Sequence, residues 1–139
     1  MEPAQALADL VEISPQIEAA AVVSGEGEIL GSIGVPEGRG GILARTVREL
    51  LAGAASFRSD DRRVTQLHAE LGDDGDLFAV TGAGERTIVA VARRSATPGL
   101  VFYDLKRCLA AAVEPEPEPA PAPKPRRSPR KKKEPEPET

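Results

Sequence analysis

The sequence has few of the residues from which catalytic centres and metal sites are built. Its 139 residues include one histidine, one cysteine, one tyrosine, three phenylalanines and no tryptophan. A single cysteine excludes an intramolecular disulfide framework and suits a reducing compartment. One histidine and one cysteine also exclude a zinc site of the usual cysteine- and histidine-rich kind. We therefore predict that the protein is not an enzyme, and that it has no cofactor, no metal and no small-molecule substrate.

Long apolar runs are missing as well. No segment approaches the roughly 18 apolar residues that a membrane-spanning helix needs. The first residues, MEPAQALADLVE, lack the basic region and the apolar core of a secretory signal. These features, with the single cysteine, predict a cytoplasmic protein.

Composition changes abruptly after Val113. Nine of the 13 prolines lie in residues 114–139, which read EPEPEPAPAPKPRRSPRKKKEPEPET. Such a segment cannot bury enough apolar surface to offset the entropy of ordering, so we predict a disordered tail. Residues 1–113 are enough for one compact domain with a modest core.

The predicted tail carries seven basic residues and six glutamates, a net charge of +1, whereas residues 1–113 carry −5. One interpretation of its basic block, PRRSPRKKK, is a tether to nucleic acid or to an anionic membrane. The alternative, which we favour, is a solubilising tail whose charges largely cancel. Ser128 follows two arginines and precedes a proline, which makes it a candidate for phosphorylation.

The apolar pattern of the domain predicts three helices and five strands. The run Ala-Ala-Ala-Val-Val within strand 17–24 is typical of an inner strand that is covered on both faces. Strand 63–71 alternates apolar and polar residues, as a half-exposed strand at a sheet edge does. The other expected elements are helices 3–14 and 42–57, strands 28–33, 76–81 and 86–94, and a closing helix that Thr97-Pro98 opens.

This order, α-β-β-α-β-β-β-α, belongs to the α+β class. Each strand connection except the one through the long helix is short enough to be a hairpin, and the first hairpin has the turn Gly25-Glu26-Gly27. We therefore predict a five-stranded, mostly antiparallel sheet with helices on both faces.

The long helix, residues 42–57, has an apolar and a charged side. The stripe expected to pack on the sheet consists of Leu43, Val47, Leu50, Leu51 and Ala54. The opposite side carries Arg45, Arg48, Glu49 and Ala52. On this pattern alone, the charged side is interpreted as a solvated face.

Two features predict a twofold dimer. Edge strand 63–71 exposes main-chain groups, and an open edge is a liability unless it is paired or covered. The long helix carries small residues that allow a second helix to approach, among them Gly53, which in mid-helix costs about 1 kcal/mol relative to alanine. The predicted interface consists of Ala44, Gly53, Ala55, Gln66, His68 and Glu70.

The residues that could carry chemistry have structural explanations that we prefer. His68 occupies a polar position of an alternating strand, where a solvated or interface side chain is expected. Cys108 lies within the apolar stripe of the closing helix, which predicts a buried thiol.

Two loops invite a ligand-binding interpretation that their spacing does not support. The acidic residues around Gly75 lack the spacing of a calcium loop, so we predict a hairpin turn there; they are Asp73, Asp74 and Asp76. Residues 38–41, Gly-Arg-Gly-Gly, lack the lysine and the full glycine spacing of a nucleotide-binding loop. We interpret them as an entry loop to the long helix, with Arg39 as a minor candidate for an anion contact.

Several strings of the sequence resemble the roadblock / dynein light chain family. They read IEAAAVVSGEGEIL in the first hairpin, ILARTVRELLAGAASF in the long helix, GDLFAVTGAGERTIVAVARRSA in the last strands and PGLVFYDLKRCLAAA in the closing helix. The resemblance covers roughly residues 3–113 and rests on apolar spacing and glycine turns. The family often has Asp-Gly in the first turn, where this chain has Glu26-Gly27.

This resemblance implies a roadblock/profilin-like fold and a non-catalytic binding module. Members of the family form homo- or heterodimers by aligning edge strands and long helices. Bacterial members of the family look like partners of small Ras-like GTPases that act as regulators or scaffolds. For this chain, the resemblance implies a homodimer whose outward helix side contacts the GTPase through Arg45, Arg48, Glu49 and Ala52.

A different class of protein stays open as the alternative, a small-ligand sensor of the PAS or GAF type. Such domains also wrap helices around an antiparallel sheet. Their pockets are usually lined by aromatic side chains and a few convergent polar groups. A core rich in alanine and valine and poor in aromatic residues argues against a sizeable pocket of that kind.

Overall fold

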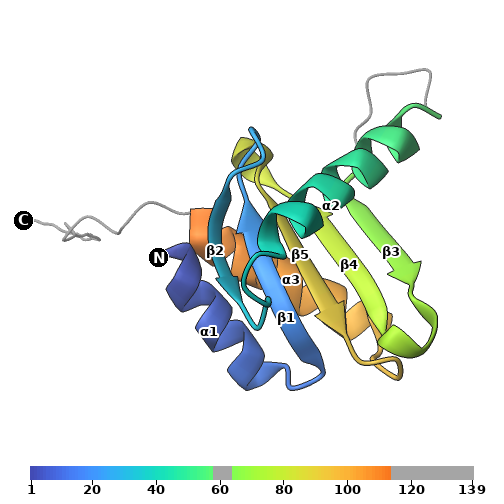
Figure 1. The fold of residues 1–139 in the computed structure, drawn as a ribbon. Coiled ribbons are helices and arrows are strands. Elements are labelled where there is room, and N and C mark those ends of the chain that lie inside the picture. Colours follow the sequence, from blue (N-terminus) through green and yellow to red (C-terminus); the bar gives the residue numbers. More distant parts are fainter. Residues whose placement is uncertain (58–63, 114–139) are drawn as a thin grey trace, which may run out of the picture.

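The computed structural model describes residues 1–57 and 64–113 of the chain (Figure 1). The helices are α1 (Pro3–Ile13), α2 (Gly40–Ala55) and α3 (Pro98–Val113), and two short 3-10 turns are η1 (Gly72–Asp74) and η2 (Ala83–Glu85). The strands are β1 (Ile17–Val23), β2 (Ile29–Ile33), β3 (Gln66–Glu70), β4 (Asp76–Thr81) and β5 (Thr87–Ala92). The predicted tail with Ser128 and the predicted strand start at Arg63 lie outside the described residues.

The element order and the α+β class are as predicted. The strands form one sheet in the order β2-β1-β5-β4-β3, and every neighbouring pair is antiparallel. Strand β1 pairs with β5 from Ile17 opposite Ala92 to Val23 opposite Thr87. This pairing brings β1 to an inner position and leaves β2 and β3 at the two edges, which confirms the predicted inner and edge strands.

Helices cover both faces of the sheet, again as predicted. Figure 1 shows α2 crossing the near face, with α3 behind the sheet and α1 beside α3. Because side chains alternate along a strand, each strand contributes to both cores. In β1, for example, Ala20 and Val22 join the core under α1 and α3, while Ala21 joins the core under α2. None of the helices in the described part of the chain is long and apolar enough to cross a membrane.

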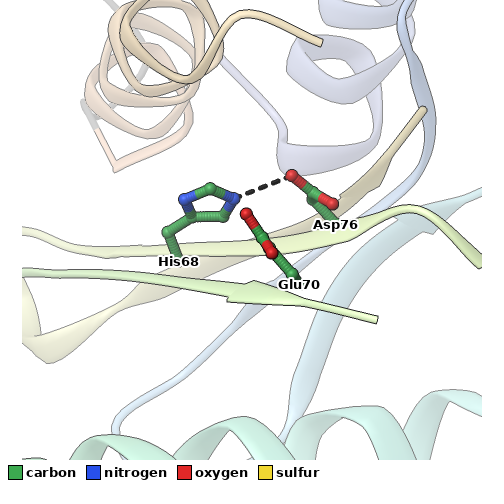
Figure 2. A group of neighbouring side chains, drawn as sticks. All are labelled: His68, Glu70 and Asp76. Atoms are coloured by element: carbon green, nitrogen blue, oxygen red, sulfur yellow. Dashed lines mark hydrogen bonds and ion pairs between the residues drawn. The ribbon is translucent and has the colours of Figure 1, made fainter. Parts of the chain in front are cut away.

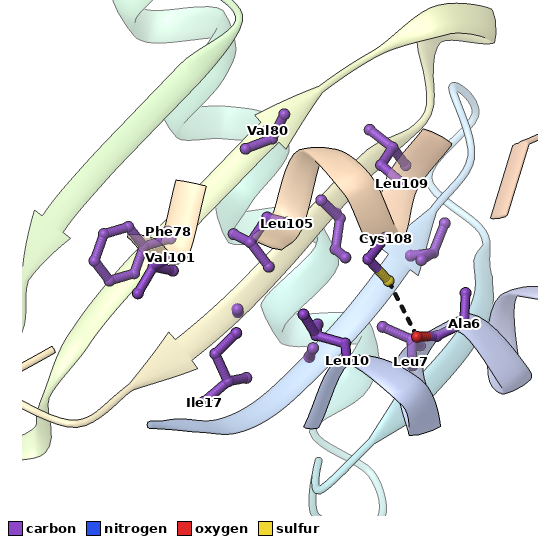
Figure 3. Close-up of a cluster of buried hydrophobic side chains, with 14 of the residues drawn as sticks. Ala6, Leu7, Leu10, Ile17, Phe78, Val80, Val101, Leu105, Cys108 and Leu109 are labelled. Carbon is purple, nitrogen blue, oxygen red and sulfur yellow. Dashed lines mark hydrogen bonds between the residues drawn. The ribbon is translucent and has the colours of Figure 1, made fainter. Parts of the chain in front are cut away.

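The larger core lies between the sheet and the pair α1 and α3 (Figure 3). Helix α1 contributes the buried residues Ala6, Leu7 and Leu10. The buried residues of α3 form one stripe along the helix, with the neighbours Cys108 and Leu109 both in it: Val101, Leu105, Cys108, Leu109 and Ala112. Alanines on the facing strands, such as Ala20 and Ala90, leave room for these longer side chains, which explains how a core with few aromatic residues packs.

The core beneath α2 is smaller. Of this helix only Ala44 and Val47 are buried, and Leu43 and Leu51 are partly so. Leu50, predicted in the buried stripe, is 41% exposed. Leu50 follows Val47 by three residues, a rotation of roughly 300° around the axis, so it lies on the flank of the helix rather than beneath it. Helix α2 is therefore held to its own sheet by a narrow apolar stripe.

Cys108 is buried, as predicted. Its side chain is part of the core between α1 and α3, and its Sγ donates a hydrogen bond of 3.4 Å to the carbonyl oxygen of Ala6 (Figure 3). Burial, with a smaller contribution from the negative charge of Asp9, raises the pKa of the Cys108 thiol from 9.0 to about 11. The thiol is therefore neutral at physiological pH and serves as an apolar core residue.

Two leucines of α3 provide a matched test of this core. Leu105 is fully buried, whereas Leu100 is 57% exposed. Leu105→Ala should lower the free energy of unfolding by about 2–5 kcal/mol, because it removes buried methyl groups and leaves a cavity. Leu100→Ala should change it by no more than about 0.5 kcal/mol. Urea unfolding of both variants measures the difference, and equal losses would contradict the assignment of this helix face.

The state of Cys108 has a direct chemical test. A shift of roughly two pKa units reduces the thiolate fraction ~100-fold, and the surrounding core restricts access further. Alkylation by iodoacetamide at pH 8 should therefore be at least about 100-fold slower in the folded protein than in urea. Rates followed by mass spectrometry decide this, and similar rates in both states would show that the thiol is accessible.

Candidate functional site

Among the described residues, no strand pairs with the outer side of β3, which forms an open edge of the sheet. The N–H of Leu71 donates to the Gly75 carbonyl at 2.8 Å, and the N–H of Thr81 donates to the Thr65 carbonyl at 3.0 Å. In an antiparallel pair, residues that bond to the neighbouring strand alternate with residues that face away from it. The main-chain groups of the even positions therefore point away from β4; these positions are Gln66, His68 and Glu70.

The side chains of β3 are divided between the two faces of the sheet, as their alternation predicts. Leu67 and Ala69 pack with the core under α2. His68 is opposite Phe78 of β4, which lies in the core under α1 and α3, so the polar side chains of β3 project on that second face. The predicted interface residues of β3 thus have main-chain groups that point out from the sheet edge and side chains that lie on the sheet face covered by α1 and α3.

An apolar groove runs between α2 and the sheet near this edge. Its volume is about 370 Å³, and apolar residues from α2, β4 and β5 dominate its lining, including Leu43, Leu77 and Val91. Ile42 of α2 and Leu71 at the end of β3 border it and are 47% and 42% exposed. Arg39, the candidate anion contact, also lines this apolar groove. Leu50 follows Leu43 by seven residues and so lies on the same side of α2, which therefore carries exposed apolar surface among the described residues.

The small residues of α2 predicted at the interface do not share one side of the helix. Ala44 and Gly53 are nine residues apart, which is two and a half turns, so they point in opposite directions. Ala44 is 3% exposed within its own subunit and has no surface to offer a partner, so its assignment to the interface is wrong. Ala55 borders a hollow beside Gly25 and Glu85 in the hairpin turns, whereas Gly53 is exposed with open space around it.

A second groove contains all four residues predicted to contact a partner. It has a volume of about 410 Å³ and lies between α2 and the β1–β2 turn. Its lining consists of Arg45, Arg48, Glu49, Ala52, Gly41, Glu26 and Gly27. We call it the charged groove, because it combines two arginines and two glutamates. The four predicted residues are therefore together on one exposed surface, although nothing in the structure itself identifies what binds there.

One wall of the charged groove is the β1–β2 turn, and the sequence pattern did not predict this contact between the turn and α2. The Arg48 Nη2 atom donates a hydrogen bond of 3.1 Å to the carbonyl oxygen of Gly25. Gly27 has a φ of +94°, and a side chain at this position would collide with the Arg48 guanidinium. The positive φ of Gly27 favours glycine at this turn, and Arg48 ties α2 to the hairpin tip.

Sequence reasoning also missed a group of three polar side chains at the β3–β4 edge (Figure 2). His68 Nε2 lies 2.8 Å from Asp76 Oδ2, and a carboxylate oxygen of Glu70 joins them, with all three atoms within 4.8 Å of one another. The expectation of a solvated His68 is incomplete, because its ring also stacks on Phe78 at 4.4 Å. The available signal was a histidine and a glutamate two residues apart on a strand, followed by an aspartate after the hairpin turn.

No known family model matches the chain, and no curated protein is significantly similar to it in sequence. Solved structures are similar in fold. A Roadblock/LC7 domain from Streptomyces avermitilis is 20% identical, with a TM-score of 0.71 over 80% of this chain and 94% of that one. The gliding protein MglB from Thermus thermophilus is 18% identical, with a TM-score of 0.63 over 80% and 88%.

A more distant likeness extends to profilins. The structure of LokiProfilin2 in complex with rabbit actin matches with 13% identity and a TM-score of 0.59, over 78% of this chain and 93% of that one. These matches confirm the fold expected from the resemblance. The chain has the fold that Roadblock/LC7 domains, MglB and profilins share.

Proposed function

We propose that this chain is a non-catalytic adaptor or regulator that forms a homodimer and binds a small Ras-like GTPase. The resemblance of its sequence implies this partner, and the likeness in fold to a Roadblock/LC7 domain and to MglB supports a regulator of this kind. The observation on which the proposal rests is the open edge of β3 beside the uncovered apolar side of α2. We place the protein in the cytoplasm, as its single cysteine suggests.

In the proposed dimer, β3 pairs antiparallel with β3 of a second copy. His68 is the middle one of the three residues whose main-chain groups face the open edge. A twofold axis near His68 lets all three positions pair, with Gln66 opposite Glu70 of the second copy. Such a pairing satisfies main-chain groups that otherwise form an aggregation-prone edge.

The apolar side of α2 supports the same arrangement. Pairing through β3 brings the second copy next to the groove between α2 and the sheet, where it covers apolar surface such as Ile42 and Leu50. The polar residues of the groove, Arg39 and Thr46, are both exposed at its rim. A small-ligand pocket usually has polar groups that converge on its ligand. We therefore assign the groove to protein contact rather than to a sensed ligand.

The charged groove is the surface we assign to the GTPase. It lies on the side of α2 that faces away from the sheet, so the dimer leaves it accessible, and its exposed residues carry both signs of charge. Charged residues at the rim of an interface mainly raise the specificity for a partner and the rate of association, and they raise the affinity less. Arg48 is already bonded to the hairpin turn, so Arg45 is the arginine of this groove with more freedom to contact a partner.

Proline at Gln66 tests the edge pairing. The N–H of Gln66 points away from β4, so Gln66→Pro keeps the bonds between β3 and β4 and removes two bonds of the proposed dimer, one from each copy. We expect the dimer dissociation constant to rise at least tenfold, which corresponds to about 1.4 kcal/mol. Sedimentation equilibrium of the full chain measures it.

Gln66→Ala is the matched control, because it removes the same side chain and keeps the N–H. It should leave the dimer nearly unchanged. Equal dissociation constants for the proline and alanine variants would remove this edge from the interface, and a wild-type protein that is monomeric at micromolar concentration would refute the dimer itself.

Charge reversal at Arg45 tests the partner surface. The tagged wild-type chain should capture a small Ras-like GTPase from its native cell, identified by mass spectrometry, in extracts supplied with GDP or with a non-hydrolysable GTP analogue. Arg45→Glu should reduce the captured amount roughly tenfold, because it turns an attraction at the groove into a repulsion.

Arg107→Glu is the control for this experiment. Arg107 is exposed on α3, on the other face of the sheet, and stands above the ring of Tyr103 at 5.7 Å. The change in charge is the same, so capture should persist. Loss of the GTPase in both variants would indicate a general charge effect, and unchanged capture by Arg45→Glu would exclude Arg45 from the site.

A further inference from the structure

We propose that His68, Glu70 and Asp76 form a binding site for a divalent transition-metal ion of the zinc class. The three side chains come from adjacent strands of one subunit and project on the sheet face of α1 and α3 (Figure 2). They do not occupy the open edge itself, because side chains stand perpendicular to the direction of strand pairing. The site uses side chains of β3 and leaves its main chain free to pair, and in the proposed dimer the two sites lie side by side across the twofold axis near His68.

The charge of this cluster points to a cation. The Asp76 side chain is 9% exposed, and its carboxylate is bonded to the imidazole of His68. A buried carboxylate is costly unless a positive charge or a metal compensates it. Glu70 adds a second carboxylate within 4.8 Å. Even a protonated imidazole supplies one positive charge against two negative ones, whereas a divalent ion balances both carboxylates.

The distances suit a small four-coordinate ion. Zinc binds imidazole nitrogen and carboxylate oxygen at about 2.0–2.2 Å, so neighbouring ligand atoms in a tetrahedral site are about 3.4 Å apart. The donor atoms here are between 2.8 Å, for His68 and Asp76, and at most 4.8 Å apart. Reaching the tetrahedral separation requires a small opening of the first pair and a rotation of the exposed Glu70 side chain.

The nature of the donors selects the class of metal. Calcium and magnesium prefer sites made entirely of oxygen ligands. An imidazole with two carboxylates instead suits zinc and its neighbours among the first-row metals. Three protein ligands leave one position of a tetrahedral ion for water, since Glu70 and His68 lie at the surface. A site of this kind takes two of its three ligands from carboxylates, so a sequence with one histidine and one cysteine can supply it.

Two of the three ligands are held in place before any metal binds. The His68 ring lies parallel to Phe78, with centroids 4.4 Å apart and planes 6° apart, and Phe102 meets Phe78 edge-on at 5.2 Å. Asp76 sits in a strand paired on both sides, with Glu70 opposite in β3 and Ala92 opposite in β5. Ligands fixed by packing lose little freedom on binding, which favours affinity.

The turn that delivers Asp76 is equally constrained. Gly75 precedes it with a φ of +97°, and a side chain at Gly75 would collide with the carbonyl oxygen of Ala92. Only glycine fits this combination of backbone angle and close approach without strain. The tight turn after η1 therefore sets Asp76 directly opposite Glu70.

Calorimetric titration of the full chain with zinc chloride, after removal of metals with a chelator, tests the proposal. We expect one zinc ion per chain, and an affinity that Glu70→Gln lowers roughly tenfold or more, because it removes one anionic ligand without changing the shape of the side chain. Glu70 is exposed, so this variant should fold normally. His68→Gln, which removes the imidazole, should lower the affinity by a similar factor.

Asp74→Asn is the matched control, since Asp74 is an exposed acidic residue of the same hairpin turn. It should bind zinc as the wild type does. As a second readout, the melting temperature of the wild type should rise with zinc concentration, because a ligand of the folded state stabilises it, and Glu70→Gln should lose most of that rise.

Two results would overturn the proposal. The first is the absence of binding at millimolar zinc, which would leave the cluster as an ion pair of the protein alone. The second is unchanged zinc affinity in both Glu70→Gln and His68→Gln, which would place the ion elsewhere on the chain. Neither result bears on the dimer or on the GTPase, which the Gln66 and Arg45 variants test separately.

Discussion

The pairing of β1 with β5 is the interaction on which the arrangement of the sheet depends. It joins the hairpin of β1 and β2 to the three-stranded meander of β3, β4 and β5, and it makes the two apolar strands central. One consequence is that the chain must cross the sheet between β2 and β3, which α2 does on one face. The other is that β3 lies at an edge, far from the hairpin, where no strand in the described part of the chain pairs with its outer side.

The same alternation gives β3 two different surfaces. At its even positions the main chain faces the open edge, while the side chains of His68 and Glu70 lie on the sheet face and meet Asp76. The odd positions, such as Leu67, bond to β4 and pack beneath α2. A short strand can therefore offer its main chain for pairing at the edge and its side chains as a cluster of ligating groups on one face.

The sequence was sufficient to predict the helices and strands and the inner and edge strands, because each depends on local periodicity. It was also sufficient to predict the buried stripe of α3, which runs from Val101 to Ala112. It was not sufficient to predict angular detail. Leu50 was expected to be buried and is exposed, whereas Ala44 was expected at an interface and is buried. Helix α2 contacts its sheet along a narrow stripe, and the apolar pattern alone does not determine which side of the helix faces the sheet. The bond from Arg48 to Gly25 and the contact of His68 with Asp76 depend on how separate elements meet in space, which no local pattern records.

Amide hydrogen exchange along β3 tests the central claim, that its open edge pairs with a second copy of the chain, most directly. Measured by NMR on the full chain at two concentrations, the N–H groups of Gln66, His68 and Glu70 should be protected at the higher concentration and lose protection on dilution. Those of Leu67 and Ala69, which face β4, should stay protected at both concentrations. Rapid exchange of the three even positions at every concentration, with the odd positions protected, would show that the edge is unpaired and would contradict the claim.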